Sequence, residues 1–465
     1  KRLLQLVRRT SMTARRWKAR SIIRAWVVCV TIAFSALAAV PASAQYLIRD
    51  AEIERSLREL ARPMITASGL SSRTIRLYVL ADDTPNAFVT NSNTIFIHSG
   101  LLLKLSTPEQ VQAVLAHEVA HIANGHLSRR AINYKDMRRR QSLALALGVA
   151  AGVAAGDAGV GAGIGAAVAG ASVNTFLGHT RAEEAAADIS AIRYMKYGGV
   201  DPASMLEVFE MFRGQEMLVP ERQSGYARSH PLTRDRIRSV EAYVDANKPK
   251  KKAGPENAYW YARLQGKLSS FLRSPSWTFN RVKAGDNSEV ARMRRAVAYL
   301  KMPDPKNAIA EADALVAMRP EDPYYQELKA QILFETRRFP EAVVEYERAL
   351  ELAPNQPLIL AAYGRALLAL KTDDGNERAL AALEKAYTRD GRNPSLLRDL
   401  ARAYAINGND GKASLMTAKR YAAMGRKRDA AIHARRAVGL LPTGSPGHRQ
   451  ATDILATAKK SEKRK

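Results

Sequence analysis

The second half of the chain repeats itself every 34 residues, and this period constrains the fold more than any other feature of the sequence. Residues 319–323, Arg-Pro-Glu-Asp-Pro, recur at 353–357 as Ala-Pro-Asn-Gln-Pro. Small residues align in the same frame at two sets of positions: Ala296, Ala330 and Gly364, and Ala308 and Ala342. Repeats of this length form pairs of helices that cross at small side chains and bury their apolar faces only by stacking. We therefore expect an α-solenoid over residues 286–443, followed by a disordered basic tail over residues 444–465.

The N-terminus has the three parts of a secretory signal. Residues 1–44 contain nine Lys or Arg and no acid, an apolar run at 25–40, and a small-residue cleavage site at 42–44. The apolar run is short for a membrane-spanning helix, so we expect cleavage and not a retained anchor. The single cysteine, Cys29, lies in this run. Disulfides and cysteine-ligated metals are therefore excluded from the mature protein.

The chain is strongly basic, with a formal net charge of +27. Outside residues 1–44, the remaining 63 basic residues still exceed the 45 acidic ones by 18. Such a charge attracts anionic surfaces such as lipid headgroups or nucleic acid, although a solvated basic surface without a dedicated partner explains it equally well. A secreted destination removes nucleic acid as a partner, so we expect none.

A helix is expected from Pro108 to about residue 123. Thr107 can cap its N-terminus, Gln110 completes a capping box, and Asn124-Gly125 supplies a stop. This helix contains the sequence His-Glu-Val-Ala-His at 117–121.

The two histidines of this helix are spaced to bind one metal ion. His117 and His121 are four residues apart and project from the same face, and Glu118 can reach a water on the same ion. A Zn²⁺ ion lowers the pKa of its bound water, and the glutamate takes the proton. Two ligands do not hold a catalytic zinc, so a third must lie elsewhere. His126 is half a turn round the helix from His117, and we interpret it as structural.

The third ligand is expected on a second helix, which covers residues 180–197 and ends at Gly198. Glu184 and Asp188 share one face of it. Glu184 can ligate the metal while Asp188 accepts a hydrogen bond from the far nitrogen of a ligating histidine. Glu183 is the alternative ligand, but the residue one turn on from it is Ala187, which leaves it without a supporting acid.

A small β-sheet is expected before the metal-binding helix. Residues 75–80, 87–90 and 94–98 have strand patterns separated by turn residues. An edge strand beside such a helix can hold an extended substrate backbone, because peptides add as a strand to an open sheet edge. We expect Thr94–His98 to be that edge.

Two further segments mark the domain organisation. Residues 143–178 are mainly Ala, Gly and Val, which favours a close-packed hairpin; a hairpin that touches the membrane or a partner is the alternative. Residues 248–255 carry a run of lysines between prolines, which indicates a domain boundary. The expected domains are thus residues 45–247, a basic linker and bridging helix at 248–285, and the solenoid.

The motif at 117–121, Glu184 with Asp188, and residues 229–236 together resemble peptidase family M48, most closely its periplasmic members with tetratricopeptide repeats. The similarity covers essentially all of the mature chain. It implies a mainly α fold with a small sheet: a zincin-type α+β metalloprotease domain followed by an α-solenoid of tetratricopeptide repeats. One departure is Ala186, where many relatives carry a second glutamate.

The resemblance assigns roles to particular residues. His117, His121 and Glu184 would bind one Zn²⁺ per chain, Glu118 would be the general base, and Asp188 would support a ligand. His230 would stabilise the oxyanion or cap the zinc as an inhibitory fourth ligand. Arg236 matches the arginine that follows it and is a further candidate for the oxyanion.

The expected function is that of a zinc endopeptidase of the periplasm. The resemblance implies that it degrades misassembled outer-membrane β-barrel proteins and assists their assembly, with the repeats docking the client or its assembly machinery. The alternative is a chaperone or adaptor whose protease site is mostly held inactive by His230.

Overall fold

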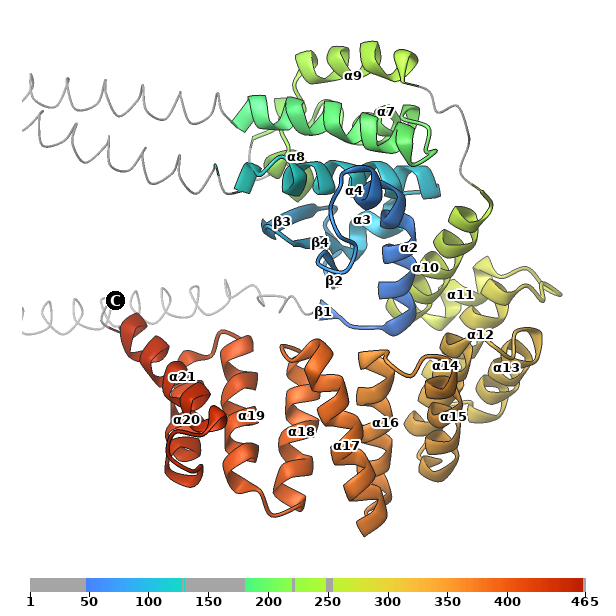
Figure 1. Cartoon of the computed structure of the whole chain (residues 1–465). Coiled ribbons are helices and arrows are strands. Elements are labelled where there is room, and N and C mark those ends of the chain that lie inside the picture. Colours follow the sequence, from blue (N-terminus) through green and yellow to red (C-terminus); the bar gives the residue numbers. More distant parts are fainter. Residues whose placement is uncertain (1–46, 128, 130–179, 220–221, 248–253, 463–465) are drawn as a thin grey trace, which may run out of the picture. The chain divides into compact units, whose positions relative to one another are not determined.

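The computed structural model describes residues 47–127, 129, 180–219, 222–247 and 254–462 (Figure 1). The predictions for the signal at 1–44, for the Ala/Gly-rich segment at 143–178 and for the lysine run at 250–252 lie outside these residues. In the described part, no helix has the length and apolar character needed to cross a membrane.

The first part of the described chain combines a small sheet with helices. Its elements are β1 (Leu47–Ile48), α2 (Ala51–Ala67), β2 (Arg76–Leu80), β3 (Ala87–Asn91), β4 (Thr94–His98), α3 (Ser99–Lys104), α4 (Pro108–Ala123), a helix over 180–197, α7 (Ala203–Glu210), a 3₁₀ turn (Gln215–Met217), α8 (Gly225–Ser229) and α9 (Arg234–Ala246). The three predicted strands are present within one residue of their expected starts.

The order of the strands contradicts the expected edge. The sheet runs β1-β2-β4-β3, with β2 and β4 parallel and β3 and β4 antiparallel. Strand Thr94–His98 is therefore internal, because the β3–β4 hairpin docks onto β2 through β4. The free edge at this side of the sheet is β3, and β3 packs beside α4.

One face of the sheet builds the core of this part. Leu77, Val79, Ile95 and Ile97 alternate along β2 and β4 and are buried in one cluster with residues of α2 and α4. On the opposite face Tyr78, Phe96 and Phe88 form a row of half-buried rings across three strands.

Helix α4 is buried on all sides, which explains why its sequence is so apolar. Every residue from Gln110 to Ile122 is buried. Thr107 caps the helix as expected, since its hydroxyl accepts from the Gln110 N–H at 3.2 Å. The Gln110 side chain reaches back to the N–H of Ser106 at 2.8 Å, one residue further than the expected capping box.

The second part is an α-solenoid of antiparallel helix pairs. Helices α10 (Glu256–Leu272) and α11 (Pro275–Arg281) lead into it, and its own helices are α12 (Glu289–Lys301), α13 (Pro305–Met318), α14 (Pro323–Glu335), α15 (Phe339–Leu352), α16 (Pro357–Leu370), α17 (Asp373–Asp390), α18 (Pro394–Ile406), α19 (Asp410–Ala423), α20 (Lys427–Leu440) and α21 (Pro446–Glu462). Helices α14 and α16 begin at Pro323 and Pro357, 34 residues apart.

The aligned small residues lie where helices cross. Ala296, Ala330, Ala308 and Ala342 are all fully buried. At Gly364 an added Cβ would lie 2.6 Å from Cγ of Leu383, so only glycine allows α16 and α17 to pack this closely. These contacts are the ones that the 34-residue period predicts.

The expectation of a disordered tail is wrong for most of its length. Helix α21 covers Pro446–Glu462 and packs against α19 and α20. Ala451, Ile454 and Ala458 recur at helical spacing, and Ala451 is fully buried in the solenoid core. The many lysines at the end of the sequence obscured this short apolar stripe.

Candidate active site

Three segments far apart in the sequence bring four ligand-type side chains together. His117 and His121 project from α4, Glu184 comes from the helix over 180–197, and His230 follows α8. One potential ligand atom from each residue lies within 4.8 Å of the others, and all four residues are buried. All four are among the site residues selected in the sequence analysis, His230 on the family resemblance alone.

The first three of these residues form a close triangle. The Nε2 atoms of His117 and His121 are 3.1 Å apart, and the Glu184 carboxylate oxygens lie 3.3 Å and 3.4 Å from them. Two imidazole nitrogens and a carboxylate oxygen are a donor set that suits a divalent transition metal, with room for a further ligand.

The protonation states of these three residues are compatible with a cation bound between them. Burial lowers the pKa of His121 to about 3, so its ring is neutral. Burial also opposes charge on His117, but hydrogen bonds to Asp188 and Glu184 outweigh it and raise the pKa of His117 to about 10. Burial would raise the pKa of Glu184, yet the neighbouring histidines hold it well below its usual range. The Glu184 and Asp188 carboxylates thus favour a positive charge beside His117, which a proton on its ring or a bound metal ion can supply.

His117 is held from behind by an acid and an arginine. The Asp188 carboxylate lies 3.0 Å from His117 Nδ1, as expected for a supporting acid. Arg236 donates two hydrogen bonds to Asp188, at 2.7 Å and 2.8 Å, and a third to the carbonyl of Pro231. The expected role of Arg236 at the oxyanion does not fit this geometry, because its guanidinium is engaged with Asp188.

His121 has a supporting partner that the sequence analysis did not find. His126 is buried, and its Nδ1 lies 3.0 Å from Nδ1 of His121. Helix α4 ends at Ala123, and Gly125 adopts φ +67°, a left-handed turn that redirects the chain. The interpretation of His126 assumed a continuous helix. The glycine between the two histidines was the available signal for the turn.

His230 stands at the fourth position of the cluster. Its Nδ1 lies 2.9 Å from Glu184 Oε2 and 3.2 Å from His117 Nε2. Its Nε2 lies 3.2 Å from the Ala87 carbonyl oxygen and 3.3 Å from Glu118 Oε1. His230 therefore touches the ligand cluster, the carboxylate expected as the base, and the edge strand.

The edge strand β3 offers backbone groups next to the cluster. The His98 N–H donates to the Asn86 carbonyl, so in this antiparallel ladder residues 86 and 88 pair with β4. The amide groups of Ala87 and Val89 consequently point to the free edge. The contact of His230 with the Ala87 carbonyl shows that one of these edge groups is already used.

Comparisons with known proteins agree with this site. Residues 48–244 match peptidase family M48. The beta-barrel assembly-enhancing protease of Escherichia coli (strain K12) is 23% identical over 391 residues, which cover 82% of this chain and 77% of that protein. A mitochondrial metalloendopeptidase of Schizosaccharomyces pombe is 24% identical over 208 residues, covering 45% of this chain and 57% of that protein.

Similar solved structures include a tetratricopeptide-repeat protein of Thermus thermophilus, which is 18% identical. The match covers 36% of this chain and 100% of that chain, with a TM-score of 0.26. The Cut9-Hcn1 hetero-tetramer matches 77% of this chain and 86% of that chain at 11% identity, with a TM-score of 0.33. The solenoid itself is evident from the stacked helix pairs described above. Residues 48–244 thus form a peptidase family M48 domain, and a solenoid of helix pairs with a 34-residue period follows it.

Proposed function

We propose that the protein is a zinc-dependent endopeptidase of the periplasm that degrades misassembled outer-membrane β-barrel proteins and assists their assembly. The observation that carries this proposal is the convergence of the His117, His121 and Glu184 donor atoms beside Glu118. The signal-like sequence at the N-terminus supports a periplasmic location. The name of the Escherichia coli relative supports the substrate class.

In this proposal each site residue has a separate role in the reaction. His117, His121 and Glu184 hold the zinc, which when bound polarises the scissile carbonyl and acidifies water. Glu118 takes the proton from the attacking water and returns it to the leaving amine. The outward amide groups of Ala87 and Val89 hold the substrate backbone as an added strand.

The position of the His230 side chain supports a second candidate function. Its Nδ1 contacts Glu184 and His117, and its Nε2 contacts the Ala87 carbonyl that an added strand would use. A side chain in this position competes with both substrate and water. The protein would then act mainly as a chaperone or adaptor through its repeats, with proteolysis held off until His230 moves.

A single substitution tests the proposed chemistry. Glu118→Gln keeps the shape of the side chain but removes the base, so cleavage of an unfolded outer-membrane β-barrel protein should fall by at least about a hundredfold. Glu109→Gln, on the same helix and half-buried, is the matched control and should retain activity. Chelation should abolish cleavage and Zn²⁺ should restore it; unchanged cleavage after verified metal removal would contradict the zinc assignment.

The same variant separates the two candidates in cells. If proteolysis is the main function, Glu118→Gln should fail to complement a deletion strain. Full complementation by Glu118→Gln would favour the chaperone or adaptor function instead.

A further inference from the structure

A cleft of about 730 Å³ lies between the sheet and the last helices of the solenoid. One side is the sheet face that carries Tyr78 and Phe96, and the other comes from the turn after α17 and from α19 and α21. None of the four residues of the candidate metal cluster lines it. None of the functions discussed above uses this cleft.

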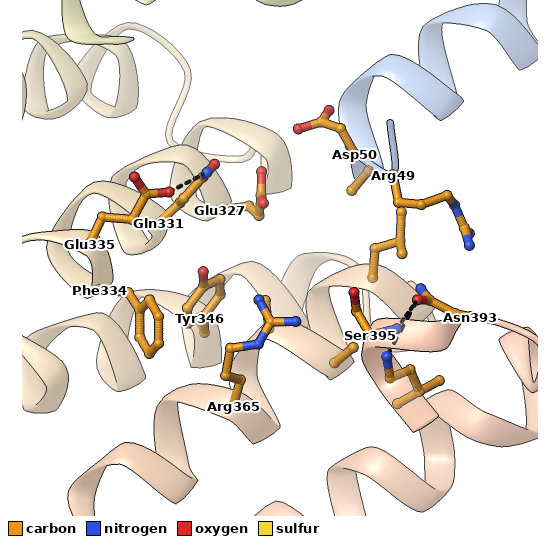
Figure 2. A pocket seen from close by; sticks show the side chains of 15 residues that line it. Arg49, Asp50, Glu327, Gln331, Phe334, Glu335, Tyr346, Arg365, Asn393 and Ser395 are labelled. Atoms are coloured by element: carbon orange, nitrogen blue, oxygen red, sulfur yellow. Dashed lines mark hydrogen bonds between the residues drawn. The ribbon is translucent and has the colours of Figure 1, made fainter. Parts of the chain in front are cut away.

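A second cavity, of about 260 Å³, lies within the solenoid and shares Arg49 with the cleft (Figure 2). Its walls combine charged side chains of both signs: Asp50, Glu327, Glu335, Arg49 and Arg365. Because opposite charges are mixed around it, this cavity does not select a ligand by the sign of its charge. The cleft beside the sheet differs in this respect.

The charges of the cleft that have no ionic partner are mainly positive. Arg49 and Asp390 bind each other at 2.8 Å and neutralise one another. Within the described residues, three cations that line the cleft have no acidic partner: Arg76, Arg392 and Lys419. One acid that lines it, Asp453, has no basic partner in that part of the chain. Three cations against one acid favour a ligand with negative charge.

The cleft also has an aromatic and apolar surface. Tyr78 and Phe96 are half-buried neighbours on β2 and β4, with ring centroids 5.8 Å apart. Ala423 of α19 and Ile454 of α21 add apolar groups from the solenoid. A further aromatic ring can pack against these residues.

The cleft continues the edge strand on which the substrate is proposed to add. The carbonyl of Ala87, near the start of β3, contacts His230, and the last residues of β3, Thr90 and Asn91, line the cleft. A strand advances about 3.3 Å per residue, so the cleft begins about 10 Å from Ala87. A substrate strand added to β3 therefore reaches it within about three to five residues of the scissile bond.

The strand register gives the order of the groups along the cleft. Tyr78 is in register with Phe96, which pairs with the second residue of β3. Arg76 is in register with Thr94, which pairs with the last residue of β3. The rings are therefore nearer to the metal cluster, and Arg76 lies further along by one same-face repeat of about two residues.

We propose that the cleft is a subsite that selects an aromatic residue of the substrate strand and, two positions further from the scissile bond, an acidic one. This inference rests on the proposed endopeptidase function and names part of its substrate preference. Side chains two apart on a strand share a face, so the ring packs on Tyr78 and Phe96 while the carboxylate meets the three unpaired cations. A basic residue in place of the acid faces like charges.

The test measures binding separately from cleavage. Full-length protein carrying Glu118→Gln is titrated into fluorescent twelve-residue peptides, and anisotropy is recorded. The first peptide has Phe and Asp two positions apart, the second has Lys in place of Asp, and the third has Ser in place of Phe. The first should bind at least about fivefold more tightly than the second and at least about threefold more tightly than the third, since each loses one set of contacts.

Variants assign this preference to the cleft. The double variant Arg76→Gln, Arg392→Gln should reduce the preference for Asp over Lys at least about threefold. Ala423→Trp changes an exposed position of the cleft and should weaken binding of the first peptide at least about fivefold, because the indole fills the apolar space. Arg73→Gln is the matched control, because Arg73 is exposed just before β2 but does not line the cleft. It should leave the preference unchanged.

Three results would overturn the proposal. The first and second peptides could bind equally, the double variant could keep the full preference, or Arg73→Gln could lose it as the double variant does. A second copy of the chain seated in the cleft would give dimers in sedimentation and no discrimination among the peptides, which also counts against the subsite. An active protease without the preference would contradict the subsite alone, whereas an inactive protein with the preference would contradict the endopeptidase function.

Discussion

His117 and His121, the two histidines proposed as metal ligands, are each contacted from behind by a second residue. His117 has Asp188, which is itself fixed by Arg236, and His121 has His126. Such partners set which ring nitrogen carries the proton and keep the other free for a metal.

His230 gives the first prediction at the scale of single residues. If His230 caps the site, His230→Ala should raise the basal cleavage rate several-fold, because it removes the contacts to Glu184 and to the Ala87 carbonyl. Initial rates on an unfolded β-barrel substrate check this. Loss of activity would instead favour the oxyanion role, which requires His230 for the reaction.

The sequence predicted some of these residues and missed others for a physical reason. His117, Glu118 and His121 lie within one helix, where spacing alone determines which side chains share a face. Glu184 and Asp188 follow the same rule. The contact of His126 and the pairing of Arg236 depend on how the chain turns between elements, which helical periodicity does not describe.

At the scale of elements, strand order was the feature that the sequence left undetermined. The three strands were recognised from their own residues, but their order depends on pairing between distant segments. The parallel pairing of β2 with β4 makes β3 the edge beside the site. The solenoid was easier to predict, because each helix pair contacts mainly its neighbours.

The edge strand can be tested without changing the metal cluster. In Val89→Pro the N–H that points to the free edge is lost, whereas the pairing of β3 with β4 does not use it. We expect kcat/KM for an unfolded protein substrate to fall at least about tenfold, with bound metal unchanged, because one main-chain hydrogen bond to an added strand is missing.

Val89→Ala is the control and should cleave almost normally. Normal kcat/KM in Val89→Pro would show that substrate does not add to β3.

At the scale of the whole described chain, helix α10 connects the peptidase domain to the solenoid through buried charges. Arg263 is 1% exposed and binds Glu52 of α2 and Asp322, the residue that caps α14. Lys267 is fully buried and binds Asp50, Glu52 and Glu327. These ion pairs join α2 and α14 across α10, so the two parts should unfold together.

Removing one charged residue of this buried network should lower the free energy of unfolding. Arg263→Met leaves the buried carboxylate of Glu52 with fewer partners, and we expect a loss of about 3 kcal/mol in the free energy of unfolding. Arg378→Met removes exposed ion pairs with Glu347 and Asp374 and should cost less than about 1 kcal/mol. Denaturant titration followed by circular dichroism compares them. Equal stability of the two variants would mean that the junction does not contribute as described.

The central claim is that His117, His121 and Glu184 bind one zinc ion, and the metal content of the purified protein tests it most directly. Elemental analysis should give about one zinc per chain, because His117, His121 and Glu184 together form a single proposed site, and almost none in Glu184→Ala. Glu183→Ala, altered at the neighbouring carboxylate, should keep its zinc. Zinc that stays bound in Glu184→Ala, or a protein that takes up no zinc when supplied with it, would contradict the account.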